Sequence, residues 1–374
     1  MLKQSCLRKI LVVGGVILLG SMLLKSATRA TSKPHQIIAP PKVVTVKQQV
    51  DPKFKNKLVP TLKKDNYSGT AIIYQNSRRV ASYNAGYADY LSRSKNQLNT
   101  MYEIDSIQKS ITGVLVMQQV TQHKLALSDH LSMFYPDVPG SQNITIRQML
   151  NMTSGLVLTG PVGPNMAESD TQIIQSDISR VHYLGVMNGH WNYQAVNFNL
   201  LCGILEKITR QSYQQLFTTQ IIHKLHLRHT AFAYALPNSA DSATGYSGLI
   251  NTNQASLYAK PSGRNQAIAR DELGTGQVYM SAGDLYRVIS AILTGKIVSI
   301  ASLQQLYQGA SYSSYTAGFY THPNVKSANG DGYGFESSIH ISPDGKNALI
   351  LLSNYQEPLF KTRDLANQFD YLLF

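Results

Sequence analysis

The folded part of this chain begins and ends with strand-like segments and has helix-like segments between them. Residues 68–74 (SGTAIIY) and 79–85 (RVASYNA) carry β-branched and aromatic residues on either side of a short polar turn, which predicts an antiparallel hairpin. Near the other end, strands are predicted at 335–342 and 347–353, separated by a Pro-Asp-Gly turn. A sheet that needs both ends of a chain allows few topologies. We therefore predict an α+β protein whose sheet is completed by its two ends.

Apolar residues recur at helical spacing through the middle of the chain. The first long helix is predicted at 105–122, where Ile107, Ile111, Val114 and Leu115 form a stripe. Further helices are predicted at 146–152, 195–209, 213–223, 281–294 and, as a last amphipathic helix, about 359–373. No internal repeat is visible, so these elements form one folded region from about residue 54.

Almost all of the net charge lies before this region. Residues 1–64 hold thirteen Lys and Arg and a single acid, Asp51, a net +12 out of the chain's +13, so that residues 65–374 carry only +1. A nucleic-acid-binding domain would place its basic residues on the folded part. We therefore expect no nucleic-acid partner.

The first residues have the features of an export segment. Residues 1–9 are basic, and residues 10–24 (ILVVGGVILLGSMLL) carry no charge. This run is long for a signal peptide and shorter than the ~20 residues of a comfortable span. We predict that residues 1–27 form an uncleaved transmembrane signal-anchor rather than a cleaved signal peptide. The basic residues before the apolar run place all that follows outside the cytoplasm. The expected location is the cell membrane, or the outside of the cell if the signal is cleaved.

Residues 28–53 are rich in Pro and Lys and show no helical or strand period. They are predicted to form a solvated tether. Its lysines would also be attracted to anionic lipid or to an anionic wall polymer such as teichoic acid.

One pair of residues suggests nucleophilic catalysis. Ser106 and Lys109 stand at i and i+3 at the start of the predicted 105–122 helix, close enough for the amine to take the hydroxyl proton. Free backbone N–H groups at a helix start also favour an oxyanion. A second Ser-x-x-Lys, Ser92 to Lys95, lies in a polar loop with no apolar helix after it, so only Ser106 is a candidate nucleophile.

Seven sequence blocks in a fixed order resemble one family. They are YSGTAIIY, GYADY, YEIDSIQKS (102–110), ITIRQMLNMTSGL (144–156), YQAVNFNLLCGILEKITRQSY (193–213), GTGQVYMSAGDL (274–285) and NGDGYGFESSIHISPDGKNALILLSN (329–354). Together they resemble the serine β-lactamase and penicillin-binding-protein superfamily, most closely its class C-like branch, which includes D-alanyl carboxypeptidases and teichoic-acid D-alanyl esterases.

The resemblance implies a β-lactamase/transpeptidase-like fold over residues 54–374. Its sheet part, an antiparallel sheet flanked by helices, would be about 54–105 and 270–374. An all-helical part would be about 106–269, with the active site in the cleft between them. No metal ion or other cofactor is implied.

The resemblance also implies residue roles. Ser106 matches the nucleophile, Lys109 the general base, and Tyr193 the tyrosine of the Tyr-x-Asn element that shuttles a proton. Ala195 stands where that element has its substrate-binding asparagine.

The family's third element, Lys-Thr-Gly or His-x-Gly, becomes Ala328-Asn329-Gly330, with Lys326 two residues early. The backbone N–H of Asp331 would then complete the oxyanion hole with that of Ser106. Without the third-element cation, a substrate's terminal carboxylate would lose a charge-assisted contact.

A D-alanyl ester has no terminal carboxylate and offers an ammonium, which Glu103, Asp105 or Asp331 would favour. The sequence therefore predicts a serine acyl hydrolase that releases D-alanine from a wall polymer such as teichoic acid. A D-Ala-D-Ala carboxypeptidase acting on peptidoglycan stem peptides is the near alternative, and a catalytically silent wall-polymer-binding protein is the alternative of another class.

Overall fold

The computed structural model describes residues 50–166, 169–237, 241–248, 257–262, 266–309, 315–357 and 361–374. The predicted signal-anchor and all but the last four residues of the predicted tether lie outside the described residues. Gln48–Phe374 is a compact unit by itself and contains both large hydrophobic cores described below. Among the described residues, no helix is long and apolar enough to cross a membrane.

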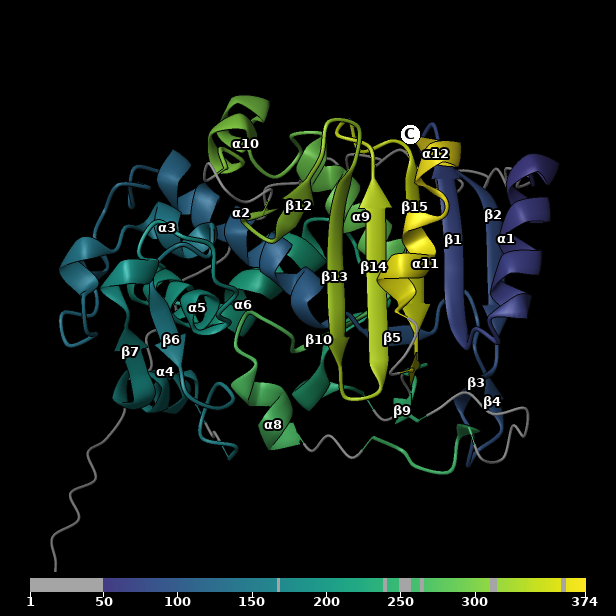
Figure 1. Ribbon diagram of the computed structural model, residues 1–374, viewed down its shortest axis with the longest axis horizontal. Coiled ribbons are helices and arrows are strands. Elements are labelled where there is room, and N and C mark those ends of the chain that lie inside the picture. Colours follow the sequence, from purple (N-terminus) through teal and green to yellow (C-terminus); the bar gives the residue numbers. More distant parts are fainter. Residues whose placement is uncertain are drawn as a thin grey trace, which may run out of the picture. The chain divides into compact units, whose positions relative to one another are not determined.

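Seven antiparallel strands form the main sheet in the order β11-β12-β13-β14-β15-β1-β2 (Figure 1). Their bounds are β1 Gly69–Gln75, β2 Arg78–Ala85, β11 Tyr315–Thr316, β12 Phe319–Thr321, β13 Lys326–Gly332, β14 Phe335–Ile341 and β15 Ala348–Ser353. The predicted hairpin is β1–β2, and β1 pairs with β15 so that Ile72 faces Ile350 across the ladder. The two ends of the unit therefore meet in the middle of the sheet, as predicted.

Side-chain alternation divides the residues of the central strands between two cores. Ala71 and Ile73 of β1 pack with Leu349 and Leu351 of β15 on one face, whereas Ile72 belongs to the larger core on the other face. The first face is covered by α1 (Pro52–Lys64), α11 (Thr362–Asn367) and α12 (Asp370–Leu373). The last helix, predicted as one at about 359–373, is thus two short helices.

The larger core joins the sheet to the helical part. Its central element is α2 (Gln108–Thr121), which is buried nearly all round and packs on α5 and α9. The remaining helices are α3 (Ile146–Leu150), α4 (Asp170–Arg180), α5 (Val196–Thr209), α6 (Tyr213–Phe217) with a π-helical continuation (Thr218–His223), α8 (Gln266–Asp271), α9 (Ala282–Leu293) and α10 (Ile300–Leu306).

Short strand pairs complete the fold. A three-stranded sheet joins β5 (Met101–Glu103), β10 (Val278–Ser281) and β8 (Thr230–Phe232), and the two-stranded pairs are β3 (Tyr87–Asp89) with β4 (Ser94–Lys95), β6 (Leu156–Leu158) with β7 (Val181–Tyr183), and β9 (Tyr246–Ser247) with β16 (Tyr355–Gln356). In Figure 1 the sheet, with β13 toward its left side, lies to the right of the helices α3, α5 and α6. The fold is therefore the predicted antiparallel sheet flanked by helices with an additional helical part.

Candidate active site

Ser106 lies in a tight turn between β5 and α2. A 3₁₀ helix, Asp105–Ile107, precedes α2, whose α-helical hydrogen bonding begins at Gln108. The turn is fixed because the Ile104 N–H donates to the Val278 carbonyl at 3.0 Å. Asp105 has φ +43°, a left-handed conformation that is uncommon for a residue other than glycine. Ser106 is thus held one turn before the α-helix, with its side chain toward Lys109.

Lys109 and Ser106 form the hydrogen-bonded pair that nucleophilic catalysis requires. Lys109 Nζ is 2.9 Å from Ser106 Oγ and 3.3 Å from the carbonyl oxygen of Thr275. Only 1% of the Lys109 side chain is exposed, so its amine meets the serine and little water. When unprotonated, an amine in this position can accept the hydroxyl proton as the serine attacks.

Gln108, between these two residues, ties α2 to the loop that carries Thr275. Its Oε1 accepts from the Gln277 N–H at 2.7 Å, and its Nε2 donates to the Tyr213 hydroxyl at 3.2 Å. Thr112, one turn later, donates to the Gly274 carbonyl at 2.8 Å. These buried contacts fix the loop against the Ser106–Lys109 pair, and nothing in the sequence motifs pointed to them.

A pocket of about 300 Å³ opens at Ser106. Its lining residues are Ser106, Trp191, Tyr193, Tyr315, Gly318, Tyr320, Asn329, Gly330, Asp331 and Arg363. The structure thus brings Ser106, Tyr193 and residues 329–331 to one pocket, although their motifs lie far apart in the sequence. The Lys109 amine lies 5.2 Å from the centre of the Tyr193 ring.

Tyr193 is positioned by the loop before α5. The Asn192 N–H donates to the Met152 carbonyl at 2.8 Å, and Gln194 Oε1 accepts from the Leu158 N–H at 3.2 Å. Ala195, which occupies the substrate-binding position of the Tyr-x-Asn element, stands at the N-cap of α5. It packs against the larger core and is not among the pocket-lining residues.

Strand β13 forms the opposite wall. A Cβ atom on Gly330 would lie 2.2 Å from the Ile104 carbonyl oxygen, so only glycine lets this strand approach the Ser106 turn so closely. Asn329 is oriented by Ser338, its cross-strand neighbour, whose hydroxyl donates to Asn329 Oδ1 at 2.8 Å. The altered third element, Ala328-Asn329-Gly330, therefore occupies the strand that lines the pocket.

Lys326 does not reach the pocket. It stands at the far end of β13, with 7% of the residue exposed, and its Nζ lies 2.9 Å from Thr321 Oγ1 and 4.0 Å from the centre of the Tyr307 ring. Burial lowers the pKa of Lys326 from 10.5 to about 8. No shifted register brings this amine to the third-element position.

Replacing Lys326 by methionine should stabilise the protein at neutral pH without changing its catalysis. The unfolded chain holds the lysine proton up to its ordinary pKa of 10.5, whereas the folded state loses it near about 8, so stability falls as the pH drops from 10.5 to 8 and stays low below that. Lys326→Met removes this penalty, on the order of 1–3 kcal/mol. Urea unfolding should show a higher free energy of unfolding for the variant than for the wild type at pH 7, and a smaller difference at pH 10. A folded variant that has lost turnover would show that Lys326 does serve the site.

Arg363 supplies the pocket with a cation that the sequence motifs did not reveal. It comes from α11, more than thirty residues after the third element, and its half-exposed guanidinium pairs with Asp364 at 3.3 Å. Neighbouring Lys361 is engaged by Asp331 at 2.9 Å and by Glu336 at 3.2 Å. The expectation that the pocket lacks a cation for a substrate anion is therefore corrected by Arg363.

Two carboxyl groups, those of Asp105 and Glu272, lie beside the Ser106 turn. Asp105 is 5% exposed, and its Oδ2 has no hydrogen-bond partner among the described residues. Burial raises the pKa of Asp105 well above its ordinary value, nearby Glu272 and Asp331 raise it further, and Lys109 lowers it. Glu272 is adjacent, because a Cβ on Gly276 would lie 3.1 Å from Glu272 Oε2 and 3.5 Å from Asp105 Cα. Glu103, also predicted to face substrate, is fully buried in β5.

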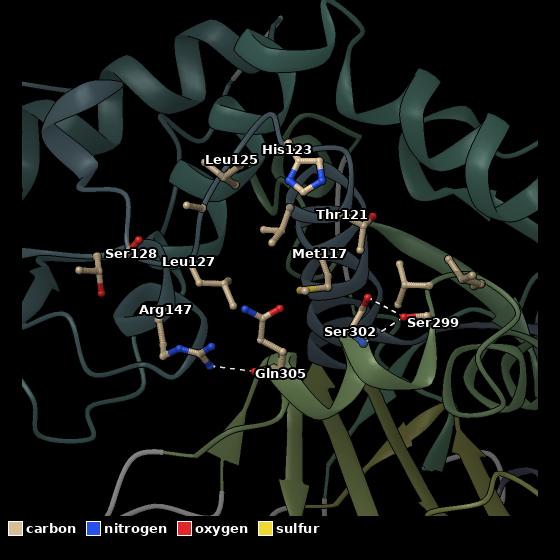
Figure 2. Close-up of a pocket in the computed structure, with 15 residues that line it drawn as sticks. Met117, Thr121, His123, Leu125, Leu127, Ser128, Arg147, Ser299, Ser302 and Gln305 are labelled. Carbon is tan, nitrogen blue, oxygen red and sulfur yellow. Dashed lines mark hydrogen bonds between the residues drawn. The ribbon is translucent and has the colours of Figure 1, made fainter.

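A larger groove, of about 1110 Å³, lies away from these residues (Figure 2). It runs between the end of α2, the following loop and α10, and none of the predicted catalytic residues lines it. Arg147 on its wall donates to the Gln305 carbonyl at 3.0 Å, and Ser299 and Ser302 hydrogen-bond one another at 2.8 Å. The larger cavity is therefore not the candidate active site. The Ser106–Lys109 contact identifies the smaller pocket as that site.

Comparison with known proteins gives the same family. The Beta-lactamase family model matches residues 54–372. The teichoic acid D-alanine hydrolase of Staphylococcus aureus is 28% identical over 324 residues, which cover 85% of this chain and 77% of that protein. The crystal structure of FmtA from Staphylococcus aureus has a TM-score of 0.73 at 24% identity, covering 87% of this chain and 88% of that one. A penicillin-binding protein from Bacillus halodurans has a TM-score of 0.68 at 18% identity, covering 85% and 99%. The protein belongs to the β-lactamase family and is a serine hydrolase of the β-lactamase/penicillin-binding-protein type.

Proposed function

We propose that this protein is a membrane-anchored, extracytoplasmic esterase that releases D-alanine from a wall polymer of the teichoic acid type through an acyl-enzyme on Ser106. The observation that carries the proposal is the 2.9 Å contact between Lys109 Nζ and Ser106 Oγ, at the mouth of a pocket shared with Tyr193 and β13. The anchor over residues 1–27 and the extracytoplasmic location are proposed from the sequence.

The reaction would proceed in two halves. Ser106 Oγ attacks the ester carbonyl carbon while Lys109 accepts the serine proton, and the N–H groups of Ser106 and Asp331 hold the oxyanion. Collapse of the tetrahedral intermediate breaks the bond to the polymer oxygen, which Tyr193 protonates as it leaves, and Lys109 passes its proton to Tyr193. Water then attacks the D-alanyl-serine ester while Lys109 accepts a proton from it. Transfer of this proton to Ser106 Oγ releases free D-alanine and restores the enzyme.

The charges around the site fit both ends of such a substrate. A D-alanyl ester carries an ammonium next to its carbonyl, and Asp105 and Glu272 lie beside the Ser106 turn. Because burial raises the pKa of Asp105, Glu272 would be the anionic partner of this ammonium. The polymer on the other side of the ester carries anionic phosphodiester groups, and Arg363, which lines the pocket, has a guanidinium suited to phosphate. The similarity to a teichoic acid D-alanine hydrolase supports the same substrate class.

Removing these two carboxyl groups should abolish the preference for an ammonium. In the double variant Asp105→Asn, Glu272→Gln we expect kcat/KM for a D-alanyl ester to fall about ten- to a hundredfold, since charge-assisted contacts contribute ~1.5–3 kcal/mol. The propionyl ester of the same alcohol lacks the ammonium and should be hydrolysed about as well as by the wild type. The measurement is the ratio of the two rates.

Asp137→Asn is the matched control, because Asp137 is exposed and does not line the pocket. An unchanged ratio in the double variant, with propionyl hydrolysis retained, would remove these carboxyls from substrate recognition while leaving the hydrolase intact.

Arg363 favours a second candidate as well. A guanidinium in the pocket could take the terminal carboxylate of a D-Ala-D-Ala peptide, which keeps peptidoglycan carboxypeptidase as the alternative. A silent wall-polymer-binding protein remains the alternative of another class.

Release of free D-alanine separates these functions. The protein Gln48–Phe374, which keeps the whole of α1, would be incubated with D-alanylated lipoteichoic acid and, separately, with a D-Ala-D-Ala pentapeptide. The proposal predicts release from the polymer that depends on Ser106 and little from the peptide. Release from the peptide alone would establish the carboxypeptidase, and retention of the polymer without release would indicate the binding protein.

A further inference from the structure

Helix α1 presents two opposed faces. Phe54, Leu58 and Leu62, spaced four residues apart, are almost completely buried against the outer face of the sheet. The other sides carry Lys53, Lys55, Lys57, Lys63 and Lys64, all of them exposed. At 3.6 residues per turn, Lys53, Lys57 and Lys64 fall on one line along the helix, turned away from the buried stripe.

The basic surface extends from α1 onto the sheet edge. The Asp51 N–H donates to the Val80 carbonyl at 2.9 Å, which joins the start of α1 to β2, and β2 begins with Arg78 and Arg79. Within the described ranges, none of the five α1 lysines forms an ion pair. We call these five lysines and two arginines the α1 basic surface.

Lys63 and Lys64, in the last turn of α1, suit the helix dipole, but the fold gains little from the three lysines nearer its start. Lys53 and Lys55 lie in the first turn, where the positive end of the helix dipole disfavours cations by roughly 0.3–1 kcal/mol each. Lys53 and Lys57, four residues apart, also repel one another. Folding alone would favour acidic residues in this turn, so the clustered charge suits a partner of opposite sign.

We propose that the α1 basic surface docks the folded domain onto an anionic phospholipid membrane. The lysines complement the charge of anionic headgroups, each contributing ~1 kcal/mol near such a surface. Residues 1–49, which lie outside the described residues, precede Val50 at the first turn of α1, and they include the uncharged run 10–24. The chain therefore leaves its apolar segment and enters the domain at the basic surface.

Docking there would leave the active site open to the polymer. Strands β14, β15 and β1 lie between β13, which lines the pocket, and β2, which borders α1 (Figure 1). We therefore expect membrane binding and hydrolysis of a small soluble ester to be independent.

Vesicle binding tests this proposal. The protein Gln48–Phe374, which lacks the apolar run, would be sedimented with phosphatidylcholine vesicles with and without phosphatidylglycerol. We expect binding that requires phosphatidylglycerol and weakens with salt. The triple variant Lys53→Gln, Lys57→Gln, Lys64→Gln should bind these vesicles about ten- to a hundredfold more weakly. Its hydrolysis of a soluble ester should be unchanged.

The matched control is Lys124→Gln, Lys224→Gln, Lys296→Gln, which removes the same charge from exposed positions elsewhere and should bind nearly as the wild type. Equal losses in both triple variants, or wild-type binding to phosphatidylcholine alone, would overturn the proposal. The proposal would also be wrong if the triple α1 variant kept its vesicle affinity but no longer bound soluble teichoic acid without D-alanine. The α1 basic surface would then be a binding site for the polymer.

Discussion

Replacing Ser106 with alanine should leave a folded protein that releases no measurable D-alanine from the polymer. The substitution removes the atom that forms the acyl-enzyme, and losing such a nucleophile lowers kcat by on the order of 10⁴–10⁶. Ser106 lines the pocket, and among the described residues its hydroxyl bonds only to Lys109, so the melting temperature should change little. Initial rates with a soluble ester and with the polymer measure the loss.

The chain provides its own control for this variant. Ser92 is the serine of the other Ser-x-x-Lys sequence, and its exposed hydroxyl lies 3.0 Å from that of Ser94. Ser92→Ala should therefore be fully active. Substantial turnover by Ser106→Ala would mean that another group performs the attack, and the proposed acyl-enzyme would be wrong.

Lys109→Met should produce the second largest loss. Methionine fills nearly the same volume as the buried lysine and leaves no charge behind, so the fold should survive while Ser106 loses its proton acceptor. A missing general base lowers the rate about 10²–10⁴-fold. The loss should appear in kcat and in the rate of acylation more than in KM, because the amine contacts the nucleophile rather than the bound ester.

Lys95→Met is the matched control, since Lys95 is exposed and its amine lies 3.3 Å from the centre of the Tyr87 ring, far from the pocket residues. Pre-steady-state kinetics with a chromogenic ester separates acylation from deacylation. A Lys109→Met enzyme with normal acylation would assign the proton transfer to another residue, with Tyr193 the nearest pocket candidate.

The sheet and α2 were predictable because their residues follow simple periods. Strands β1 and β15 alternate between two buried faces, and α2 carries an apolar stripe that continues through Leu115. Helix α1 was missed although the folded region was predicted to begin at about residue 54. Pro60 and the lysines obscured the helical stripe of Phe54, Leu58 and Leu62. The final helix was predicted as continuous, whereas the chain turns at Gln368 and Phe369 before α12.

Some residues of the candidate site were predictable from local sequence patterns, and others were not. Ser106, Lys109, Tyr193 and Gly330 belong to local patterns, and each of them is found at the pocket or hydrogen-bonded to Ser106. Arg363 belongs to no such pattern. Its helix, α11, packs on β14 and β15, next to the strand β13 that lines the pocket, a long-range arrangement that local spacing does not encode.

The same limit applies to the acidic side of the site. Glu272 comes next to Asp105 because Gln108 and Thr112 hold the 274–277 loop against α2. Such contacts depend on tertiary packing, so residues far from a motif in sequence become neighbours that only the structure reveals.

The most direct measurement is the mass of the Ser106 peptide after rapid acid quenching of the protein Gln48–Phe374 with D-alanylated lipoteichoic acid. The proposal predicts a population of this peptide heavier by one alanyl group, present in the wild type, absent in Ser106→Ala and enriched when deacylation is slowed. Release of D-alanine with no alanyl group on Ser106 at any quench time, or an alanyl group on a different residue, would contradict catalysis through Ser106.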